Sequence, residues 1–436
     1  MDWCLRLSLG YTKDEERATT DNNGCKPSLG GPSMKILMTS DLYTPAINGV
    51  VTSIQTLKQA LEAAGHEVRV LTLSPKPGFD QEEGVYSVSS ISLNKIYPGA
   101  RVSFTTTDWI KDQILNWQPE LIHTHCEFST FKMAKAIAKD LAIPIVHTYH
   151  TIYEDYTHYF SPNKKMGKKI VSLMSKHLLN QVNYVIAPTQ KVKDMLMGYQ
   201  VQSSIAIIPT GIPSQKFSHV LSQAERQKLR SQAGYQEGDR LLVFLGRLAK
   251  EKNLSEILDY LSQREDSSLK LMICGDGPYK ASLQSQVNEL GLSDRVHFTG
   301  MVDPNQVANY YQMADLFVSA STSETQGLTY IEALFSGLPL LCRQDDSLKE
   351  VIQTGLNGFA YQDVEDFYQK LDRLLADPKT LGQMGDFARS QALQSFSAQA
   401  FGQAVSDLYE EVLDDHVPAS SQAKSHKGLS TLRTWG

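Results

Sequence analysis

Short apolar runs alternate with amphipathic segments through the first half of the chain. The runs at 36–38, 68–73, 121–123, 145–147, 184–187 and 206–208 predict buried strands. Between the first two, Ile54, Leu57 and Leu61 fall on one side of a predicted helix that stops at Gly65. A strand, a helix and a strand in units of about thirty residues are typical of a parallel sheet with right-handed crossovers.

The second half repeats this alternation after a hinge-like linker with prolines at 209 and 213. Apolar runs at 241–245, 271–274, 296–298, 316–319 and 339–342 predict strands, and 363–377 and 381–413 predict helices. A chain of 436 residues with 41% hydrophobic residues can bury two cores of ordinary size. We expect an α/β protein with a disordered leader (1–33), a first Rossmann-like domain (34–209), a linker (210–218), a second Rossmann-like domain (219–395), a final helical segment (396–416) and a flexible tail (417–436).

Composition limits where the protein works. The five cysteines are scattered and never form a C-x-x-C pair, which argues against a disulfide framework or a zinc cluster and for a reducing compartment. No apolar run approaches the roughly 20 residues that span a bilayer. The net charge of −6 conceals a basic surplus between residues 34 and 209. We expect a cytoplasmic protein, free or attached to a membrane surface, without a nucleic-acid partner.

Two glutamates eight residues apart mark the first candidate site. Glu324 precedes Gly327 on a loop, and Glu332 lies about one turn into a helix whose buried side includes Leu328. The N-terminus of that helix can bind a phosphate through its free N–H groups, and a carboxylate at Glu332 can accept hydrogen bonds from two vicinal sugar hydroxyls. Taken alone, both glutamates could also be solvated surface charges.

A second stretch favours the functional interpretation. The apolar run 241–245 ends in Gly246, and Arg247, Lys250 and Lys252 follow within six residues. Cations on a glycine turn suit a diphosphate.

Together the two stretches resemble the carboxyl-terminal domain of retaining glycosyltransferases of family four, through the patterns E-x7-E and G-R-x4-K-N. The resemblance implies the GT-B fold, with two Rossmann-like domains facing a central cleft and a final helix (396–416) that packs back on the first domain. It also implies a nucleotide-sugar donor. It further implies that Glu332 holds the ribose hydroxyls, that Glu324 touches the donor sugar, and that Arg247 and Lys252 neutralise the diphosphate. Donor contacts are also implied at Gly49, after the first strand, and at Gly327, Leu328 and Thr329. A plain turn glycine is the alternative for Gly49.

Histidines cluster after two predicted strands, at His123, His125, His147 and His150. Ligands bind at the carboxyl ends of parallel strands, so we expect these side chains to line the cleft, with packing inside the strand favoured for His123 and His147. A metal site is disfavoured because the surrounding ligand spacing does not match zinc. The family resemblance implies that His150 lies beside the donor sugar and phosphate, and we take His150 and Glu324 as the catalytic candidates.

A lysine-rich helix is predicted from residue 163. Met166, Ile170, Leu173, Met174 and Leu178 share one side, and the candidate membrane-surface lysines are Lys164, Lys165, Lys168, Lys169 and Lys176. The pattern fits an interfacial helix with lysines toward anionic headgroups, but it slightly favours a helix that faces the core with a solvated basic back. With the preceding motif from His147 to Tyr156, the segment resembles bacterial diacylglycerol glucosyltransferases.

This resemblance implies transfer of glucose from UDP-glucose to diacylglycerol at the inner face of the cell membrane, giving a glycolipid for membrane or lipoteichoic acid anchoring. Two alternatives stay open: another acceptor (a sugar, a phosphoinositol or a protein), or a non-catalytic nucleotide-sugar or membrane-binding module. We expect no resident cofactor and no metal site, with Mg²⁺ at most a stimulator. Gly275-Asp-Gly277-Pro resembles part of a dinucleotide fingerprint, but it lacks the third glycine.

Overall fold

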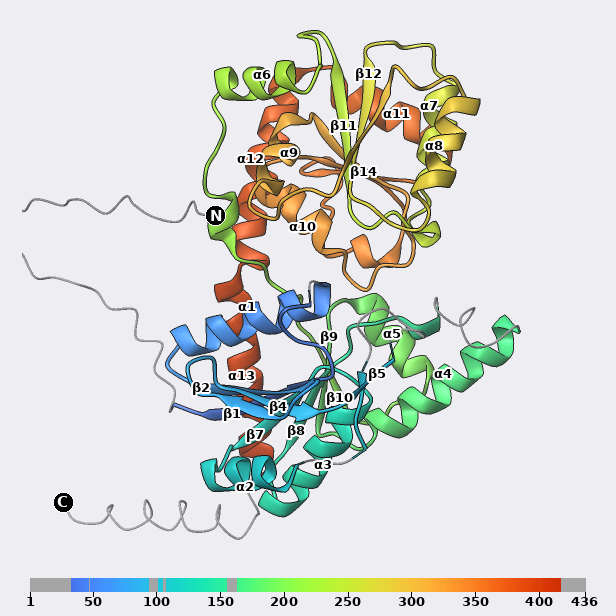
Figure 1. The fold of residues 1–436 in the computed structure, drawn as a ribbon. Helices are drawn as coiled ribbons and strands as arrows, with labels where there is room; N and C mark the ends of the chain where they lie inside the picture. The colour runs from blue at the N-terminus through green and yellow to red at the C-terminus, as the bar shows by residue number, and fades with distance from the viewer. Residues whose placement is uncertain (1–32, 47, 94–100, 105–106, 155–162, 417–436) are drawn as a thin grey trace, which may run out of the picture. The chain divides into compact units, whose positions relative to one another are not determined.

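A computed structural model describes residues 33–46, 48–93, 101–104, 107–154 and 163–416 (Figure 1). The predicted leader up to residue 32 and the predicted tail from residue 417 lie outside the described residues. The domain boundaries given above stay predictions.

The first sheet has eight strands in the order β10-β9-β8-β7-β1-β2-β4-β3. Neighbouring strands in this sheet are parallel, except that the edge strand β3 runs antiparallel to β4. The strands are β1 (Lys35–Ser40), β2 (Glu67–Ser74), β3 (Gly78–Asp80), β4 (Val85–Ser89), β7 (Leu121–Thr124), β8 (Ile145–Thr148), β9 (Tyr184–Ala187) and β10 (Ser204–Ile207). A separate pair joins β5 (Ile91–Ser92) and β6 (Arg101–Val102).

Helices cover both faces of this sheet, since successive strand residues point to opposite faces. Ile36 and Met38 of β1 enter the core shared with α1 (Gly49–Ala63) and α13 (Ala398–His416). Leu37 enters the other core. The helices of that second face are α2 (Asp108–Trp117), α3 (Ser129–Leu141), α4 (Lys164–Leu179) and α5 (Gln190–Gly198).

The second sheet has six parallel strands in the order β13-β12-β11-β14-β15-β16. They are β11 (Arg240–Leu245), β12 (Leu269–Cys274), β13 (Val296–Gly300), β14 (Leu316–Ser319), β15 (Leu340–Arg343) and β16 (Gly358–Tyr361). One face packs on α9 (Val307–Met313), α10 (Leu328–Phe335) and α12 (Pro378–Ser395), and the other on α7 (Leu254–Ser262), α8 (Lys280–Glu289) and α11 (Val364–Leu375). Helix α6 (Gln223–Gln232) precedes β11. All the strands predicted from apolar runs are confirmed, and the α/β class with parallel sheets is confirmed with them.

Residues 381–413, predicted as helical, belong to two helices, α12 and α13, with a break at Phe396 and Ser397. The break has a local cause. Ile212 of the linker donates its N–H to the Phe396 carbonyl at 2.9 Å, and the Ala398 N–H donates to the Ile212 carbonyl at 3.0 Å. These two bonds hold the chain extended, and α13 then continues to the first sheet.

Candidate active site

The chain turns sharply into α10 at Gly327. Its φ of 77° lies in the left-handed region, and a Cβ there would stand 2.5 Å from the ring of the buried Tyr330. Only glycine fits this position without displacing that ring. The turn leaves the first N–H groups of α10, at Leu328 and Thr329, without partners inside the helix.

Glu332 lies one turn into the same helix. The Tyr311 hydroxyl of α9 donates to Glu332 Oε2 at 2.9 Å. Burial raises the pKa of the Glu332 carboxyl to about 7, against the opposing effect of the Tyr311 hydrogen bond. A carboxylate has room for more than one donor, so Glu332 can accept further hydroxyl hydrogen bonds.

A second helix N-terminus meets α10. Helix α1 begins at Gly49, where the Asn48 side chain accepts the Val51 N–H at 2.9 Å. A Cβ added to Gly49 would stand 3.7 Å from Leu328 Cδ1, at the start of α10. Each N-terminus carries roughly half a positive charge, so the two together form a place suited to an anion.

Arg247 and Lys252, the two cations predicted to bind the diphosphate, follow β11, and each forms an ion pair. Lys252, at the end of a short 3-10 turn (Lys250–Lys252), donates to Glu324 Oε1 at 2.5 Å. Arg247 pairs with Glu251, and its side chain is 44% exposed. The structure therefore joins Lys252 directly to Glu324, a contact that the sequence analysis did not predict.

The four histidines form one cluster at the carboxyl ends of β7 and β8. His123 and His125 rings lie 4.1 Å apart, and His125 Nδ1 lies 3.0 Å from His150 Nε2. His123 is fully buried between Tyr409 of α13 and Thr148, which confirms packing within the strand for this residue. Burial lowers the pKa of His150 to about 3, with a further lowering from His147, so its imidazole is neutral at neutral pH.

His147 packs inside the strand as well. Its Nδ1 lies 2.7 Å from Thr124 Oγ1, and its Nε2 faces Glu127 Oε1 at 3.5 Å. Glu127 also accepts a 2.5 Å hydrogen bond from Tyr153. Among the described residues no group of three or more His, Cys, Asp and Glu side chains could hold a metal ion.

Helix α4 corrects one interpretation. Its inward side consists of Gly167, Val171, Ser175 and Leu179, which are buried. Met166, Ile170 and Leu173 are 52%, 48% and 58% exposed. The favoured prediction, in which these three face the core, is therefore wrong, because a different side of the helix, with Val171 and Leu179, packs on the core. We call these three residues the exposed apolar stripe.

The candidate lysines belong to the same helix. Lys165, Lys168 and Lys169 are exposed, whereas Lys176 is half-buried. Lys168 pairs with Glu154 at 2.5 Å, and Lys176 donates to Gln200 Oε1 at 2.8 Å. The side chain of Lys164 lies outside what the structure describes. No described helix is long and apolar enough to cross a membrane.

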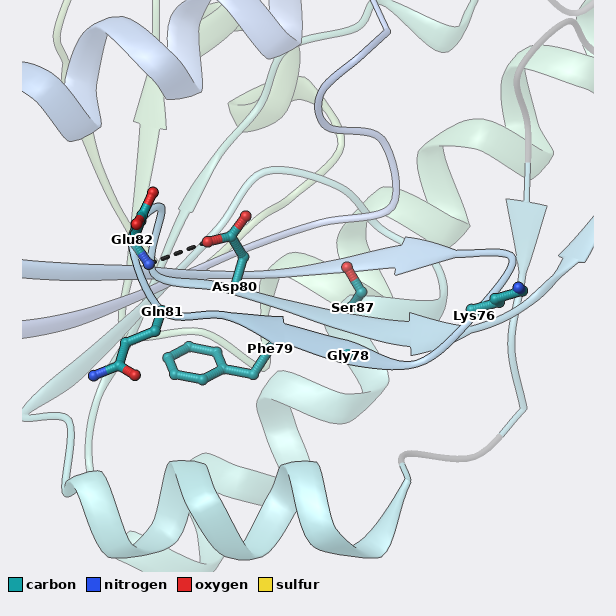
Figure 2. A pocket seen from close by; sticks show the side chains of 7 residues that line it. All are labelled: Lys76, Gly78, Phe79, Asp80, Gln81, Glu82 and Ser87. Atoms are coloured by element: carbon teal, nitrogen blue, oxygen red, sulfur yellow. Dashed lines mark hydrogen bonds between the residues drawn. The ribbon is translucent and has the colours of Figure 1, made fainter.

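Several site residues could not be found from local sequence. Tyr311 reaches Glu332 from the preceding helix, Tyr409 reaches His123 from the far end of the chain, and Lys191 binds the loop that carries Glu324. None belongs to a motif, so only tertiary structure reveals them. A pocket at the edge of the first sheet holds none of the predicted residues (Figure 2); its lining is Lys76, Gly78, Phe79, Asp80, Gln81, Glu82 and Ser87.

Comparisons with known proteins match both halves of the chain. Residues 47–216 match the family described as Glycosyltransferase Family 4, and residues 225–391 match Glycosyl transferases group 1. The Alpha-monoglucosyldiacylglycerol synthase of Streptococcus pneumoniae is 36% identical over 87% of this chain and 86% of its own length. The enzyme of the same name from Acholeplasma laidlawii is 32% identical over 87% of this chain and 98% of its own.

Solved structures share the fold. The Anabaena protein HepE in complex with UDP-glucose superimposes with a TM-score of 0.67 at 18% identity, over 87% of this chain and 100% of that one. Sucrose-phosphate synthase from Thermosynechococcus elongatus gives 0.66 at 19% identity, over 88% and 100%. The chain therefore belongs to glycosyltransferase family four and is a hexosyltransferase with the GT-B fold.

Proposed function

We propose that the protein transfers glucose from UDP-glucose to the free hydroxyl of 1,2-diacylglycerol and forms alpha-monoglucosyldiacylglycerol with retained anomeric configuration. Binding of the nucleotide-sugar donor is supported by one observation: the N-termini of α1 and α10 lie next to each other, and Glu332 lies one turn into α10. The acceptor assignment is supported by the two relatives that are more than 30% identical, both of which are named Alpha-monoglucosyldiacylglycerol synthase.

The donor fits this arrangement by charge. In this proposal the diphosphate binds at the two N-termini, near Gly49, Gly327, Leu328 and Thr329. Arg247 and Lys252, which pair with Glu251 and Glu324 in the structure, neutralise its charge. Charged hydrogen bonds of this kind contribute roughly 1.5–3 kcal/mol each. The ribose hydroxyls donate to Glu332, and Glu324 contacts the sugar. Preorganised donors of this kind stabilise the charge that develops on the leaving diphosphate.

The reaction proceeds by attack from the leaving-group face. The bond between the sugar C1 and the phosphate oxygen breaks, a bond between C1 and the acceptor oxygen forms, and the acceptor proton moves to the leaving phosphate oxygen. Glu324 and Glu332 serve as donor ligands, and neither is a covalent nucleophile. Neutral His150 contributes a hydrogen bond to the sugar or phosphate rather than a positive charge.

The acceptor reaches the enzyme from an anionic membrane surface through α4. The exposed apolar stripe can enter the interface while lysines of the same helix contact headgroups, each contributing about 1 kcal/mol. We therefore infer a peripheral location on the inner face of the cell membrane, where its glycolipid could anchor membrane or lipoteichoic acid structures. Mg²⁺ would act only as a stimulator, through the diphosphate.

The test is mass spectrometry of lipid products after incubation with UDP-glucose and diacylglycerol in vesicles with and without anionic lipid. We expect monohexosyl-diacylglycerol, formed faster with anionic lipid. UDP release without glycolipid would contradict the acceptor and direct the search to soluble sugars, phosphoinositol or protein. UDP-glucose binding without any transfer, under all acceptors, would instead favour a binding module.

The matched variants follow from the site. His150→Ala should reduce turnover with modest loss of UDP binding, and full activity would remove its role.

Lys165→Glu with Lys169→Glu should reduce vesicle binding and glycolipid formation together, while UDP binding stays unchanged. Equal vesicle binding by this double variant would contradict the role of α4.

A further inference from the structure

The loop between β14 and α10 is held from outside by residues of the first half of the chain. The Thr189 hydroxyl, at the start of α5, donates to the Thr325 carbonyl at 2.8 Å. The Gln326 side chain exchanges two hydrogen bonds with the backbone of Thr210, at 2.8 and 2.9 Å. This loop has no helix or strand of its own, so its shape depends on such contacts.

Lys191 of α5 makes the most extensive of these contacts. Its Nζ donates to the Thr322 carbonyl at 2.9 Å and to the Glu324 carbonyl at 3.2 Å. The same Nζ lies 2.8 and 2.9 Å from the two carboxylate oxygens of Asp345. The Lys191 side chain is only 20% exposed, and Asp345 is itself fixed by accepting the Ser347 N–H at 2.9 Å.

Lys191 binds the backbone of the loop as well as a carboxylate. An ammonium has three N–H donors, and here they serve two loop carbonyls and one carboxylate. An ion pair alone would hold α5 to Asp345 without touching the loop. Two of the three acceptors are backbone groups of Thr322 and Glu324, so the position of the cation sets where the Glu324 backbone lies.

We propose that Lys191 is a positioning residue for the donor sugar, acting through Glu324. It fixes the Glu324 backbone from one side, while Lys252 holds the Glu324 carboxylate from the other. The inference rests on the proposed function, in which Glu324 contacts the sugar and Glu332 contacts the nucleoside. Loss of Lys191 should therefore weaken recognition of the sugar and leave recognition of UDP largely intact.

The experiment measures dissociation constants of UDP and UDP-glucose by calorimetry, without acceptor, for the full chain. The variants are Lys191→Met, Glu324→Ala and the double variant, and the quantity compared is the ratio of the UDP-glucose constant to the UDP constant. We expect this ratio to rise about tenfold in each single variant and no further in the double variant, because both changes remove one interaction. Lys193→Met is the control, since residues two apart on α5 point to nearly opposite sides.

The results distinguish a failure of the role of Lys191 from a failure of the role of Glu324. If Lys191→Met weakens UDP and UDP-glucose equally, or if its effect adds fully to that of Glu324→Ala, Lys191 is structural and the inference is overturned. An unchanged ratio in Lys191→Met overturns it as well, provided that Glu324→Ala alters the ratio. If Glu324→Ala itself leaves the ratio unchanged, the role of Glu324 in the proposed function fails, and the inference fails with it. Thermal unfolding of each variant shows whether the fold is retained.

Discussion

At the scale of single residues, the protonation of Glu332 depends strongly on its surroundings. Its carboxyl is buried beside Tyr311, and its pKa of about 7 lies well above the value of 4.5 that it has in the unfolded chain. The folded protein therefore binds this proton more tightly than the unfolded chain does. Between pH 4.5 and 7 this residue makes the fold less stable as the pH rises.

Binding of UDP should show the opposite trend, because ribose hydroxyls donate to an ionised carboxylate. We expect UDP affinity to increase as the pH rises from 6 to 8, through the pKa of about 7, with a slope approaching tenfold per pH unit on the acidic side. Calorimetric titrations of wild type and Glu332→Gln in the same buffers measure this. The variant carries no titrating group here, so the titration of UDP itself cancels in the comparison. Identical pH profiles would contradict the assignment of Glu332.

Gly327 allows a prediction about backbone conformation. Gly327→Ala places a methyl group 2.5 Å from the Tyr330 ring at a φ of 77°. An alanine in this region costs about 1–2 kcal/mol, and displacing the ring adds to it. We expect at least a tenfold loss of kcat/KM for UDP-glucose, together with a lower thermal midpoint. Gly382→Ala in α12 is the control, because nothing lies within 4 Å of its added methyl and we expect no loss. Wild-type kinetics in Gly327→Ala would show that α10 can begin differently.

At the level of elements, the regular repeats were the predictable part. Fully apolar runs such as 241–245 predicted the central strands because both faces of a parallel sheet are buried. The sequence analysis missed β4, in which only Tyr86 and Val88 are buried, and also the edge strand β3 and the pair β5–β6. The last three strands are two or three residues long and contain no buried residue. The orientation of α4 was also missed. Its pattern shows two apolar sides, and sequence alone does not tell which one the sheet covers.

Helix α4 supports a prediction about membrane binding. Leu173→Asp puts a charge in the exposed apolar stripe without entering the core, since Leu173 is 58% exposed. We expect several-fold weaker binding to anionic vesicles in a sedimentation assay, with unchanged UDP affinity. Leu393→Asp is the matched control, because Leu393 is 50% exposed on α12. If both variants bind vesicles equally well, the stripe does not enter the membrane interface.

On the scale of the whole molecule, the site needs residues from distant parts of the chain. Motifs predicted Arg247, Lys252, Glu324 and Glu332, since each motif lies within a short segment. Their partners could not be predicted, because the Thr189 and Lys191 contacts join segments more than 130 residues apart. For α13, the family resemblance implied the return to the first domain, whereas its apolar residues alone could have packed on either sheet. In the structure Phe401, Val405 and Tyr409 pack into the first sheet's core.

The return of α13 to the first sheet can be tested at Tyr409. Its hydroxyl lies 2.6 Å from His123 Nδ1, and Thr148 Oγ1 lies 2.7 Å from His123 Nε2. Burial holds the pKa of His123 well below its usual value, so the ring is neutral and has one donor and one acceptor nitrogen. Both nitrogens are satisfied only when α13 is in place.

Tyr409→Phe keeps the ring and removes the hydroxyl, which leaves a fully buried nitrogen of His123 without a partner. An unsatisfied buried polar group costs about 1–3 kcal/mol, so we expect the free energy of unfolding, measured by denaturant titration, to fall by that amount. Tyr184→Phe is the control, because it also removes a hydroxyl that links α13 to a strand of the first sheet. That hydroxyl binds Glu411 and Asp415 at the surface, where water can replace the lost bonds, and we expect a loss below about 1 kcal/mol. Equal small losses would mean that apolar packing alone holds α13. A clearly larger loss at Tyr409 would show that the last helix also satisfies the buried histidine cluster next to the catalytic candidate.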